Sequence, residues 1–248
     1  MLNVKISIIL VCKNSVETIS KSLQSLVDQT FKNCEIIVVD GNSTDGTKKY
    51  LQSFKKKIDH LIIEEDSGIS EAFNKGLNKA SGEWIYFLNS DDYLISNNIL
   101  EKISSNLKSN CNFVIGKVNL INKHNKIEGE FGGKKINFNN MRYYNVIPHQ
   151  STFIKKILFN KINMFDENLK LSMDYDFYWK NKSKLKIKLI DVCVAFVTRG
   201  GISEKKFINL FKEYSIIQNK YNVNNLLLNK LNYFYRLLKF FIKKLLFK

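Results

Sequence analysis

The chain has 248 residues, of which 44% are hydrophobic, with a single proline and 11 glycines. This composition excludes a disordered chain and leaves little material for a linker, so we expect one compact α/β unit, or one with a short appendage. The formal net charge of +16 indicates anionic partners and leaves nucleic acid, anionic lipid and phosphorylated substrates open.

The four cysteines show no C-x-x-C spacing. Cys12 and Cys34 lie in apolar runs, so we expect buried free thiols in a reducing compartment and no zinc site. The apolar run at 6–12 lacks a small-residue cleavage site, which favours a buried strand over a signal peptide. No stretch reaches the roughly 18 apolar residues of a membrane span. We therefore expect a protein that is soluble or lies on a membrane surface.

Four β-branched apolar runs mark the first hundred residues, at 6–12, 35–39, 60–64 and 84–88. Helix-period segments separate them: one starts behind Asn14 and Ser15, which can cap it, and a later one ends at Gly82. This alternation predicts a Rossmann-like, mostly parallel sheet flanked by helices. Further along, we expect strands at 113–120, 126–131, 151–154 and 185–197, a helix at 174–181, and helices from residue 203 onward.

Polar loops follow the four expected strands. They are Lys13-Asn14, the segment 40–46 (DGNSTDG), Asp66-Ser67-Gly68, and Asn89-Ser90-Asp91-Asp92. Ligands of such sheets bind beyond the carboxyl ends of the strands, so these loops should share one rim. Segment 40–46 alone is also typical of a turn into a helix. It lacks G-x-G-x-x-G, which disfavours a dinucleotide fold, and it lacks G-K-[ST], which excludes a P-loop.

The adjacent acids Asp91 and Asp92 predict a divalent metal site. Two neighbouring carboxylates raise one another's pKa, and a cation between them removes that cost. Oxygen ligands suit Mg²⁺ or Mn²⁺, and so few protein ligands leave coordination positions for phosphate oxygens and water. The alternative, above all for Asp92, is a cap on a helix that starts near Ser96.

Three motifs in order resemble family 2 glycosyltransferases of the GT-A fold: VVDGNSTDGT at 38–47, EDSG at 65–68 with AFNKG at 72–76, and GEWIYFLNSDD at 82–92. PHQS at 148–151 and GGIS at 200–203 are similar to the branch that builds bacterial surface polysaccharides. The resemblance covers residues 5–203. It implies a GT-A domain over 1–203, with a nucleotide-binding half at 1–110 and an acceptor-binding half at 111–203, followed by a helical segment at 204–248.

The resemblance also implies roles in donor binding. Asp40 and Asp66 match acids that contact the nucleoside, usually uridine, and Lys75 belongs to the same nucleotide-binding set. Asp91 matches the last acid of the D-x-D motif, which binds the metal that bridges the diphosphate, and Asp92 can assist it. Asn89 replaces the first acid of that motif and can still accept a hydrogen bond from a ribose hydroxyl.

Downstream, the resemblance implies a catalytic base. In MDYDFYW at 173–179, Asp174 stands at the base position, and an acceptor hydroxyl needs such a carboxylate to take its proton as it attacks C1. Helical geometry sets Asp176 apart from this task, and the alternative for Asp174 is a helix N-cap. We expect His149 and Gln150 to line the acceptor or diphosphate pocket, and Arg199 to belong to a loop that closes on the donor. A structural histidine and a solvated arginine in a turn are the alternatives.

Segment 231–248 is basic and aromatic-rich, without an acid. On a helical wheel Arg236, Lys239 and Lys243 cluster on one side, while Phe240 and Phe247 fall among the bases. Such a helix indicates a membrane-surface anchor with anionic lipid as partner. The competing interpretation is a helix packed on the domain or on a second copy.

Taken together, the residues and the resemblance predict an inverting, metal-dependent glycosyltransferase of bacterial surface polysaccharide biosynthesis. The expected donor is a nucleotide-diphosphate sugar, usually a UDP-sugar, the acceptor a lipid-linked saccharide, and the cofactor Mn²⁺ or Mg²⁺. We expect a cytoplasmic protein, peripheral on the inner face of the cytoplasmic membrane. The alternatives are a nucleotidyltransferase acting on sugar phosphates, which would need a Gly-rich basic loop after the first strand, and a nucleic-acid-binding protein, which the apolar character of the basic tail disfavours. No nucleic-acid partner is expected.

Overall fold

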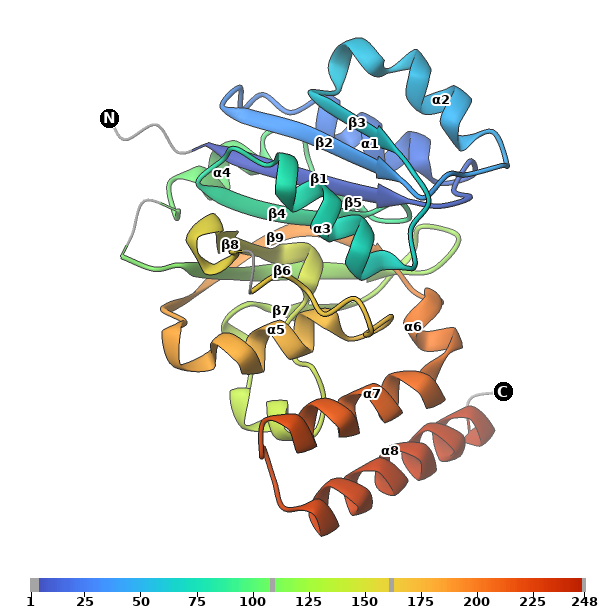
Figure 1. Ribbon diagram of the computed structural model, residues 1–248, viewed down its shortest axis with the longest axis vertical. Helices are drawn as coiled ribbons and strands as arrows, with labels where there is room; N and C mark the ends of the chain where they lie inside the picture. The colour runs from blue at the N-terminus through green and yellow to red at the C-terminus, as the bar shows by residue number, and fades with distance from the viewer. Residues whose placement is uncertain (1–4, 108–109, 161–162, 247–248) are drawn as a thin grey trace.

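A computed structural model describes residues 5–107, 110–160 and 163–246. One sheet runs through the molecule in the order β3-β2-β1-β4-β8-β6-β9-β5, with β7 paired to β6 (Figure 1). Strands β1 to β4 are parallel, β8 runs antiparallel between β4 and β6, and β6 and β9 are parallel. The strands are β1 (Ile6–Cys12), β2 (Cys34–Asp40), β3 (His60–Ile63), β4 (Trp84–Asn89), β5 (Tyr93–Leu94), β6 (Phe113–Ile121), β7 (Ile127–Gly132), β8 (Thr152–Lys155) and β9 (Ile187–Thr198).

Helices cover both faces of the sheet (Figure 1). On one face lie α1 (Ile19–Val27), α2 (Thr47–Ser53) and α4 (Ile99–Ser104), which share a core with one side of β1. On the other lie α3 (Ile69–Lys79), α5 (Met173–Asn181) and α7 (Phe207–Lys220). The short α6 (Ile202–Lys205) precedes α7, and α8 (Leu226–Leu246) follows it.

Strand β1 explains why the sheet is buried on both faces. Ile6, Ile8 and Leu10 belong to one core, and Ile9 and Val11 belong to the other, because successive side chains of a strand point to opposite sides. A strand covered on both faces therefore has a continuous apolar sequence. The predicted Rossmann-like, mostly parallel sheet flanked by helices is confirmed.

Several predicted helix boundaries and caps are wrong. Helix α1 begins at Ile19 with Thr18 at its N-cap, so Asn14 and Ser15 do not cap it. Helix α3 ends at Lys79, before the expected Gly82. The caps considered for two acids are also absent, since the N-cap of α4 is Asn98 and that of α5 is Ser172. Asp92 and Asp174 are therefore free of capping roles and must be explained by their surroundings.

The cysteines are free thiols, as expected, although their burial differs. Cys12 is buried, whereas Cys34 is only partly buried at the start of β2. Cys111 is also buried, and Cys193 is partly buried.

The C-terminal helix α8 packs along α7, and this packing corrects the expected basic cluster. Arg236 is buried rather than exposed beside Lys239. Its guanidinium donates to the Ser215 hydroxyl at 3.1 Å and to the Tyr143 carbonyl. The side chains of Lys243, Lys244 and Lys248 lie outside the described residues. Within the part that is described, no helix combines the length and apolar character needed to cross a membrane.

Glu35 links the starts of β1, β2 and β4 by hydrogen bonds, at the edge of the sheet opposite the polar loops. Its carboxylate accepts hydrogen bonds from the Ser7 hydroxyl, from the Ser81 backbone N–H at 2.6 Å and from the Gly82 backbone N–H at 3.0 Å. Burial acts to raise the pKa of Glu35, but these hydrogen bonds outweigh it and lower the pKa to about 2. The site is therefore built for an ionised carboxylate.

We expect Glu35→Gln to reduce the free energy of unfolding by about 2 kcal/mol at pH 7, because an amide –NH₂ would face donors. Since folding lowers the pKa of Glu35, its stabilisation is present above the unfolded pKa of 4.5 and is lost as pH falls towards 2. Urea unfolding across this range should show the two proteins converging in acid. Glu83→Gln is the control, because Glu83 makes one surface ion pair, 3.0 Å from Lys155. Equal effects of the two changes at pH 7 would contradict the assignment.

Candidate active site

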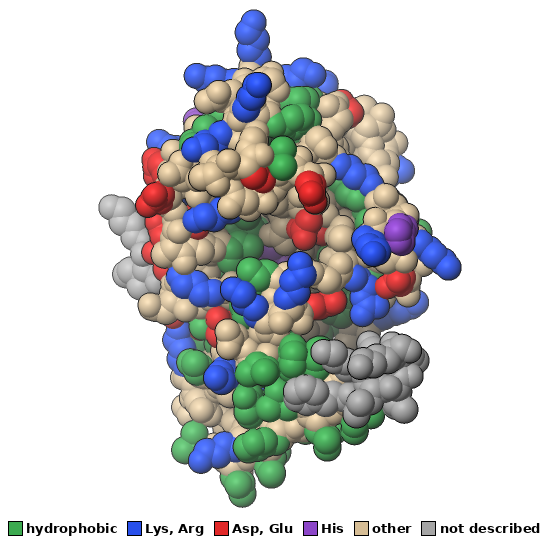
Figure 2. Space-filling model, turned by 90° about the vertical axis from the view of Figure 1, so that its right-hand side faces the viewer, with side chains coloured by type: hydrophobic (Ala, Val, Ile, Leu, Met, Phe, Trp, Pro, Cys, Tyr) green, Lys and Arg blue, Asp and Glu red, His purple; other side chains and the backbone are tan. Residues whose placement is uncertain are grey.

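A cleft of about 1270 Å³ opens at the carboxyl ends of the parallel strands. Figure 2 looks onto this edge and shows acidic side chains around a hollow, with Lys and Arg side chains below them. All four predicted loops contribute to the lining, and α6, α7 and the segment before α5 complete it. The prediction that these loops share one rim is therefore confirmed.

Hydrogen bonds connect the loop after β1 to the loop after β2. The Asn14 backbone N–H donates to the Ser43 hydroxyl at 2.7 Å, and the Asn14 side-chain oxygen accepts from the Thr44 N–H at 2.8 Å. The Val16 N–H donates to the Asp45 carboxylate at 3.0 Å. Asn14 adopts a positive φ of 51° to reach its partners, a conformation that asparagine tolerates better than most residues. These polar residues therefore hold the rim in shape.

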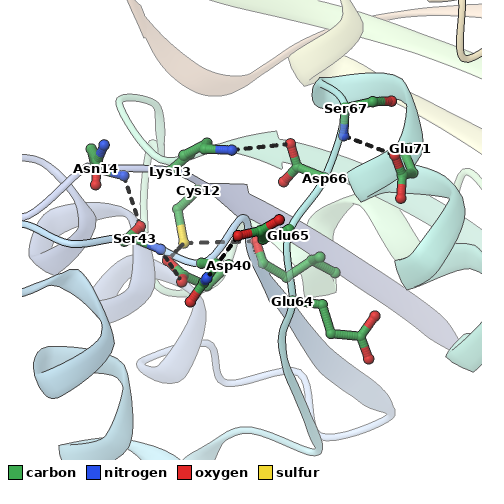
Figure 3. Close-up of polar contacts among 12 residues, drawn as sticks. Cys12, Lys13, Asn14, Asp40, Ser43, Glu64, Glu65, Asp66, Ser67 and Glu71 are labelled. Atoms are coloured by element: carbon green, nitrogen blue, oxygen red, sulfur yellow. Dashed lines mark hydrogen bonds and ion pairs between the residues drawn. The ribbon is translucent and has the colours of Figure 1, made fainter.

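Asp40 lies beneath this rim with no exposed surface. Its carboxylate accepts from the Ser43 N–H at 2.8 Å, the Ser43 hydroxyl at 2.6 Å and the Cys12 thiol at 3.4 Å (Figure 3). Burial, reinforced by the charge of Asp40, raises the pKa of the Cys12 thiol. Asp40 is not among the residues that line the cleft, so it supports the loop here, and its contact with a nucleoside stays a prediction.

Asp66 reaches the cleft directly. One of its carboxylate oxygens lies 3.8 Å from the Lys13 ammonium (Figure 3). A Cβ at Gly41 would lie 2.2 Å from the other oxygen, so glycine leaves the room that this carboxylate occupies. Asp66 and Lys13 thus place one acid and one base side by side at the wall of the cleft.

Lys75 and Arg199 do not line the cleft. The Lys75 ammonium lies 3.1 Å from Glu71 and 3.5 Å from Glu64. Arg199 is half-exposed and pairs with Glu128 at 3.3 Å. Their roles in binding the donor stay predictions, and either side chain would have to exchange an ion pair to reach it.

The loop 89–92 is held by hydrogen bonds to its backbone. The Ser22 hydroxyl donates to the carbonyls of Ser90 at 2.8 Å and Asp92 at 2.5 Å. The Thr198 hydroxyl donates to the Asp91 carbonyl at 2.7 Å. Residues from α1 and from the end of β9 therefore position the two carboxylates.

Asp92 is buried and fully engaged by the protein. It accepts from the Thr198 N–H at 3.0 Å, the Gln150 amide at 2.7 Å and the Asn89 amide at 3.2 Å. Burial, followed by the charge of Asp91, raises the pKa of Asp92. Asn89 and Gln150 are thus brought to the acidic pair, and Gln150 also lines the cleft, while its contact with acceptor or diphosphate stays a prediction.

Asp91 lines the cleft and is partly exposed. Among the described residues, only its own backbone amide is recorded as a hydrogen-bond partner of its carboxylate, and burial raises its pKa. A desolvated carboxylate that faces a cleft suits a divalent cation. Across 5–107, 110–160 and 163–246, no three His, Cys, Asp or Glu side chains gather in an arrangement that would hold a metal. A metal at Asp91 would thus take most of its ligands from substrate and water.

Asp174 lines a separate small cavity of about 10 Å³ together with Asn145 and His149. One carboxylate oxygen accepts from the Asn145 amide at 2.7 Å and the other from the Tyr175 N–H at 2.9 Å. Burial is the main reason that the pKa of Asp174 rises to about 6. A carboxylate with this pKa is ionised at neutral pH and is a stronger base than an exposed aspartate.

His149 faces this small cavity and not the large cleft. Its ring stacks on Phe87 with centroids 5.1 Å apart, and burial lowers its pKa to about 4, so the imidazole is neutral. Its Nε2 is buried, and no described residue is recorded as its partner. The predicted contact of His149 with acceptor or diphosphate stays a prediction, and His149 shares the lining of the small cavity with Asp174.

Asp176 is separate from Asp174, as their spacing predicts. It is buried against α7, with its carboxylate 2.9 Å from the Lys220 ammonium. Its contact is structural, which leaves Asp174 as the acid of this motif with access to a cavity.

Sequence reasoning missed the contribution of α7 and of the segment before α5. Glu213 lines the cleft and accepts from the backbone N–H groups of Lys170 and Leu171, both at 3.0 Å, and from the Ser172 hydroxyl at 2.7 Å. Lys170, Lys206 and Lys212 also line the cleft. These residues lie in an ordinary amphipathic helix or outside the motifs, so only the folded arrangement brings them to the site.

Comparisons with known proteins agree with the motifs. Residues 7–179 match the family "Glycosyl transferase family 2". The chain is 32% identical over 219 residues to the Escherichia coli UDP-Glc:alpha-D-GlcNAc-diphosphoundecaprenol beta-1,3-glucosyltransferase WfgD, covering 86% of this chain and 85% of that protein. This similarity favours glycosyl transfer over the nucleotidyl transfer and nucleic-acid binding considered from the sequence.

Two solved structures share the fold. The first 349 residues of TarS from S. aureus, in complex with UDP-GlcNAc, match with a TM-score of 0.68 and 19% identity, covering 94% of this chain and 71% of that one. The mannosyltransferase PcManGT from Pyrobaculum calidifontis, in complex with GDP-Man and Mn²⁺, matches with a TM-score of 0.63 and 16% identity, covering 95% and 74%. The expected GT-A fold is confirmed.

Proposed function

The chain belongs to glycosyl transferase family 2 and is a glycosyltransferase, and from this premise we propose that it transfers a sugar from a UDP-sugar to a lipid-linked saccharide in bacterial surface polysaccharide biosynthesis. The observation that carries the proposal is the cleft at the carboxyl edge of the sheet, where Asp91 faces the opening and Asp66 forms part of the wall. The name of the similar E. coli enzyme, which includes UDP-Glc and a diphosphoundecaprenol-linked sugar, supports the donor and acceptor classes.

In this proposal the donor lies across the rim of the cleft. Asp66 contacts the nucleoside, Asp40 keeps the adjoining loop in place, and Asn89 stays available to a ribose hydroxyl. Residues 1–110 thus hold the nucleotide and residues 111–203 the acceptor. The UDP-GlcNAc complex of TarS supports a uridine nucleotide in a fold of this kind.

Asp91 would hold a divalent cation, Mn²⁺ or Mg²⁺, at the diphosphate of the donor. When bound, it offsets the negative charge that develops on the leaving diphosphate. The carboxylate of Asp91 fits this role because burial disfavours its charge, and among the described residues only its own backbone amide and the charge of Lys205 offset that cost. Asp92 orients the loop through its three hydrogen bonds and contributes charge to the same region.

The transfer step is a single displacement that inverts the configuration at C1. The acceptor oxygen forms a bond to C1 as the bond from C1 to the diphosphate oxygen breaks, and the nucleotide diphosphate leaves with the bonding electrons. Asp174 takes the proton of the acceptor hydroxyl. Asn145 orients the Asp174 carboxylate through its 2.7 Å hydrogen bond. Since Asp174 lines the small cavity, the acceptor hydroxyl has to enter or open this cavity to reach it.

We expect a UDP-sugar to raise the melting temperature only when Mn²⁺ or Mg²⁺ is present. A donor at about 100 times its Kd would stabilise the fold by about 2.7 kcal/mol, which corresponds to roughly 5–10 °C for a chain of this size. A thermal-shift panel of UDP-Glc, UDP-GlcNAc and GDP-Man, with metal or with EDTA, measures this effect. Stabilisation of equal size in EDTA would contradict the proposed metal dependence of donor binding. Absence of a thermal shift with every nucleotide sugar would contradict the proposed donor class.

A further inference from the structure

Helix α8 packs on the domain with its polar side inward and its apolar side outward. Asn229, Asn232 and Arg236 are buried, whereas Leu227 and Phe234 keep 68% and 64% of their surface exposed. We use the term outer face for the exposed apolar side chains of the α7–α8 hairpin at Ile208, Ile216, Leu227, Leu231, Phe234, Tyr235, Leu238 and Ile242. A helix of a globular protein normally buries its apolar side, so this arrangement leaves the outer face without its usual cover.

Specific contacts hold the polar side of α8 in place. The Asn229 amide donates to the Asn219 side-chain oxygen at 2.7 Å, across to α7. Arg236 donates to Ser215 at 3.1 Å, and its guanidinium lies 5.6 Å from the ring centroids of Phe211 and Tyr214. A 180° rotation of α8 about its axis would break these bonds. The outward orientation of the leucines is therefore set by the hairpin itself.

The charge of helix α8 has one sign. Glu213 is the last acid in the chain, and every charged residue after it is Lys or Arg. Lys230 and Lys239 are exposed on α8 beside the apolar residues. Pairing two such faces across a two-fold axis would bring these cations together, whereas the headgroups of anionic lipids would complement them.

We propose that the outer face of the α7–α8 hairpin docks on a membrane surface that contains anionic lipid. The leucine and phenylalanine side chains enter the boundary between headgroups and acyl chains, and the flanking lysines contact lipid phosphates. This surface differs from the basic cluster expected from the helical wheel, because Arg236 binds the protein and the apolar residues face the lipid.

The docking face lies next to the cleft. Helix α7 contributes Lys212 and Glu213 to the cleft lining and Ile208 and Ile216 to the outer face. Figure 2 shows hydrophobic side chains gathered at the lower end of the molecule, below the hollow that carries the acids. Docking therefore brings the cleft close to the headgroup layer. If the acceptor is lipid-linked, as the proposed function holds, its saccharide is presented at that height.

Sedimentation with lipid vesicles tests the docking without any need for activity. The full chain is mixed with vesicles of phosphatidylcholine alone or with added phosphatidylglycerol, and the bound fraction is measured. We expect binding to the anionic vesicles that salt weakens. The triple variant Leu231→Ser, Phe234→Ser, Leu238→Ser should bind at least about tenfold more weakly, because it removes three buried apolar contacts with lipid. Lys230→Gln with Lys239→Gln should weaken binding to anionic vesicles by about tenfold or more and leave binding to neutral vesicles unchanged.

The control variant is Ile127→Ser with Ile157→Ser, which removes two exposed apolar side chains away from the hairpin. It should bind like the wild type, and circular dichroism should show the same melting temperature for all variants. Failure of the wild type to bind anionic vesicles overturns the proposal, as does a dimer in light scattering that the triple variant dissociates. Transfer of sugar to a short soluble acceptor should be unchanged in the triple variant. This readout belongs to the proposed function, so a failure of docking and a failure of catalysis are distinguishable.

Discussion

Asp174→Asn is expected to reduce the turnover number by about 10²- to 10⁴-fold while the donor still binds. The amide keeps the shape of the side chain but cannot take a proton from the acceptor hydroxyl. In the proposed function, donor binding depends on Asp66 and Asp91, which line the large cleft, whereas Asp174 lines the small cavity. Initial rates with saturating donor measure turnover, and the donor-dependent thermal shift measures binding.

The matched control for this prediction is Asp176→Asn, two residues along the same helix. Asp176 pairs with Lys220 and does not reach either cavity. We expect a loss of stability with turnover per folded molecule retained. Unchanged turnover in Asp174→Asn, or equal losses in the two variants, would contradict the assignment of the base.

The pH dependence of the same reaction separates a base from a structural carboxylate. Because burial raises the pKa of Asp174 to about 6, the group is protonated and inactive below that pH. We expect kcat/KM to rise with pH through about 6 and then level off. The Asn145 hydrogen bond and the Tyr175 N–H lower the pKa, while Glu213 raises it. Asn145→Ala should therefore move the rising limb to higher pH.

Sequence patterns predicted the helices and strands in which buried residues recur at a regular spacing. The strand β1 is apolar at every position because both faces are covered, so its sequence indicates both its structure and its place in the sheet. The loops after such strands inherit their position from the parallel topology, which is why Asp66 and Asp91 were correctly expected at one rim.

The positions that sequence did not predict depend on specific hydrogen-bond partners that a residue pattern does not reveal. Asp40 ends strand β2 and Asp66 follows strand β3, but the Ser43 hydroxyl and backbone N–H hold Asp40 below the surface. Arg236 shares a side of the helix with Lys239, yet it is buried because the Tyr143 carbonyl and Ser215 lie opposite it. A helical wheel separates two faces and contains no information on which of them meets the domain.

The adjacent acids Asp91 and Asp92 should respond in opposite ways to the same substitution. Asp91→Asn is expected to abolish the metal-dependent donor stabilisation and to lower activity by at least about 100-fold, because it removes the proposed protein ligand of the metal. The fold should not suffer, since burial already disfavours the charge of Asp91. Melting curves of the free protein should therefore match those of the wild type or lie above them.

Asp92→Asn also removes a charge that burial and Asp91 disfavour, but it is expected to destabilise the free protein by about 1–3 kcal/mol net, because an amide nitrogen would face donors that now meet a carboxylate oxygen. Those donors are the Thr198 N–H and the amides of Gln150 and Asn89. Two measurements on both variants distinguish the roles of Asp91 and Asp92. They are the melting temperature without ligand and the Mn²⁺-dependent shift of that temperature with a UDP-sugar. Retention of the full metal-dependent shift in Asp91→Asn would place the cation elsewhere. Loss of that shift with unchanged stability identifies Asp91 as the ligand and leaves Asp92 as the residue that holds the loop for it.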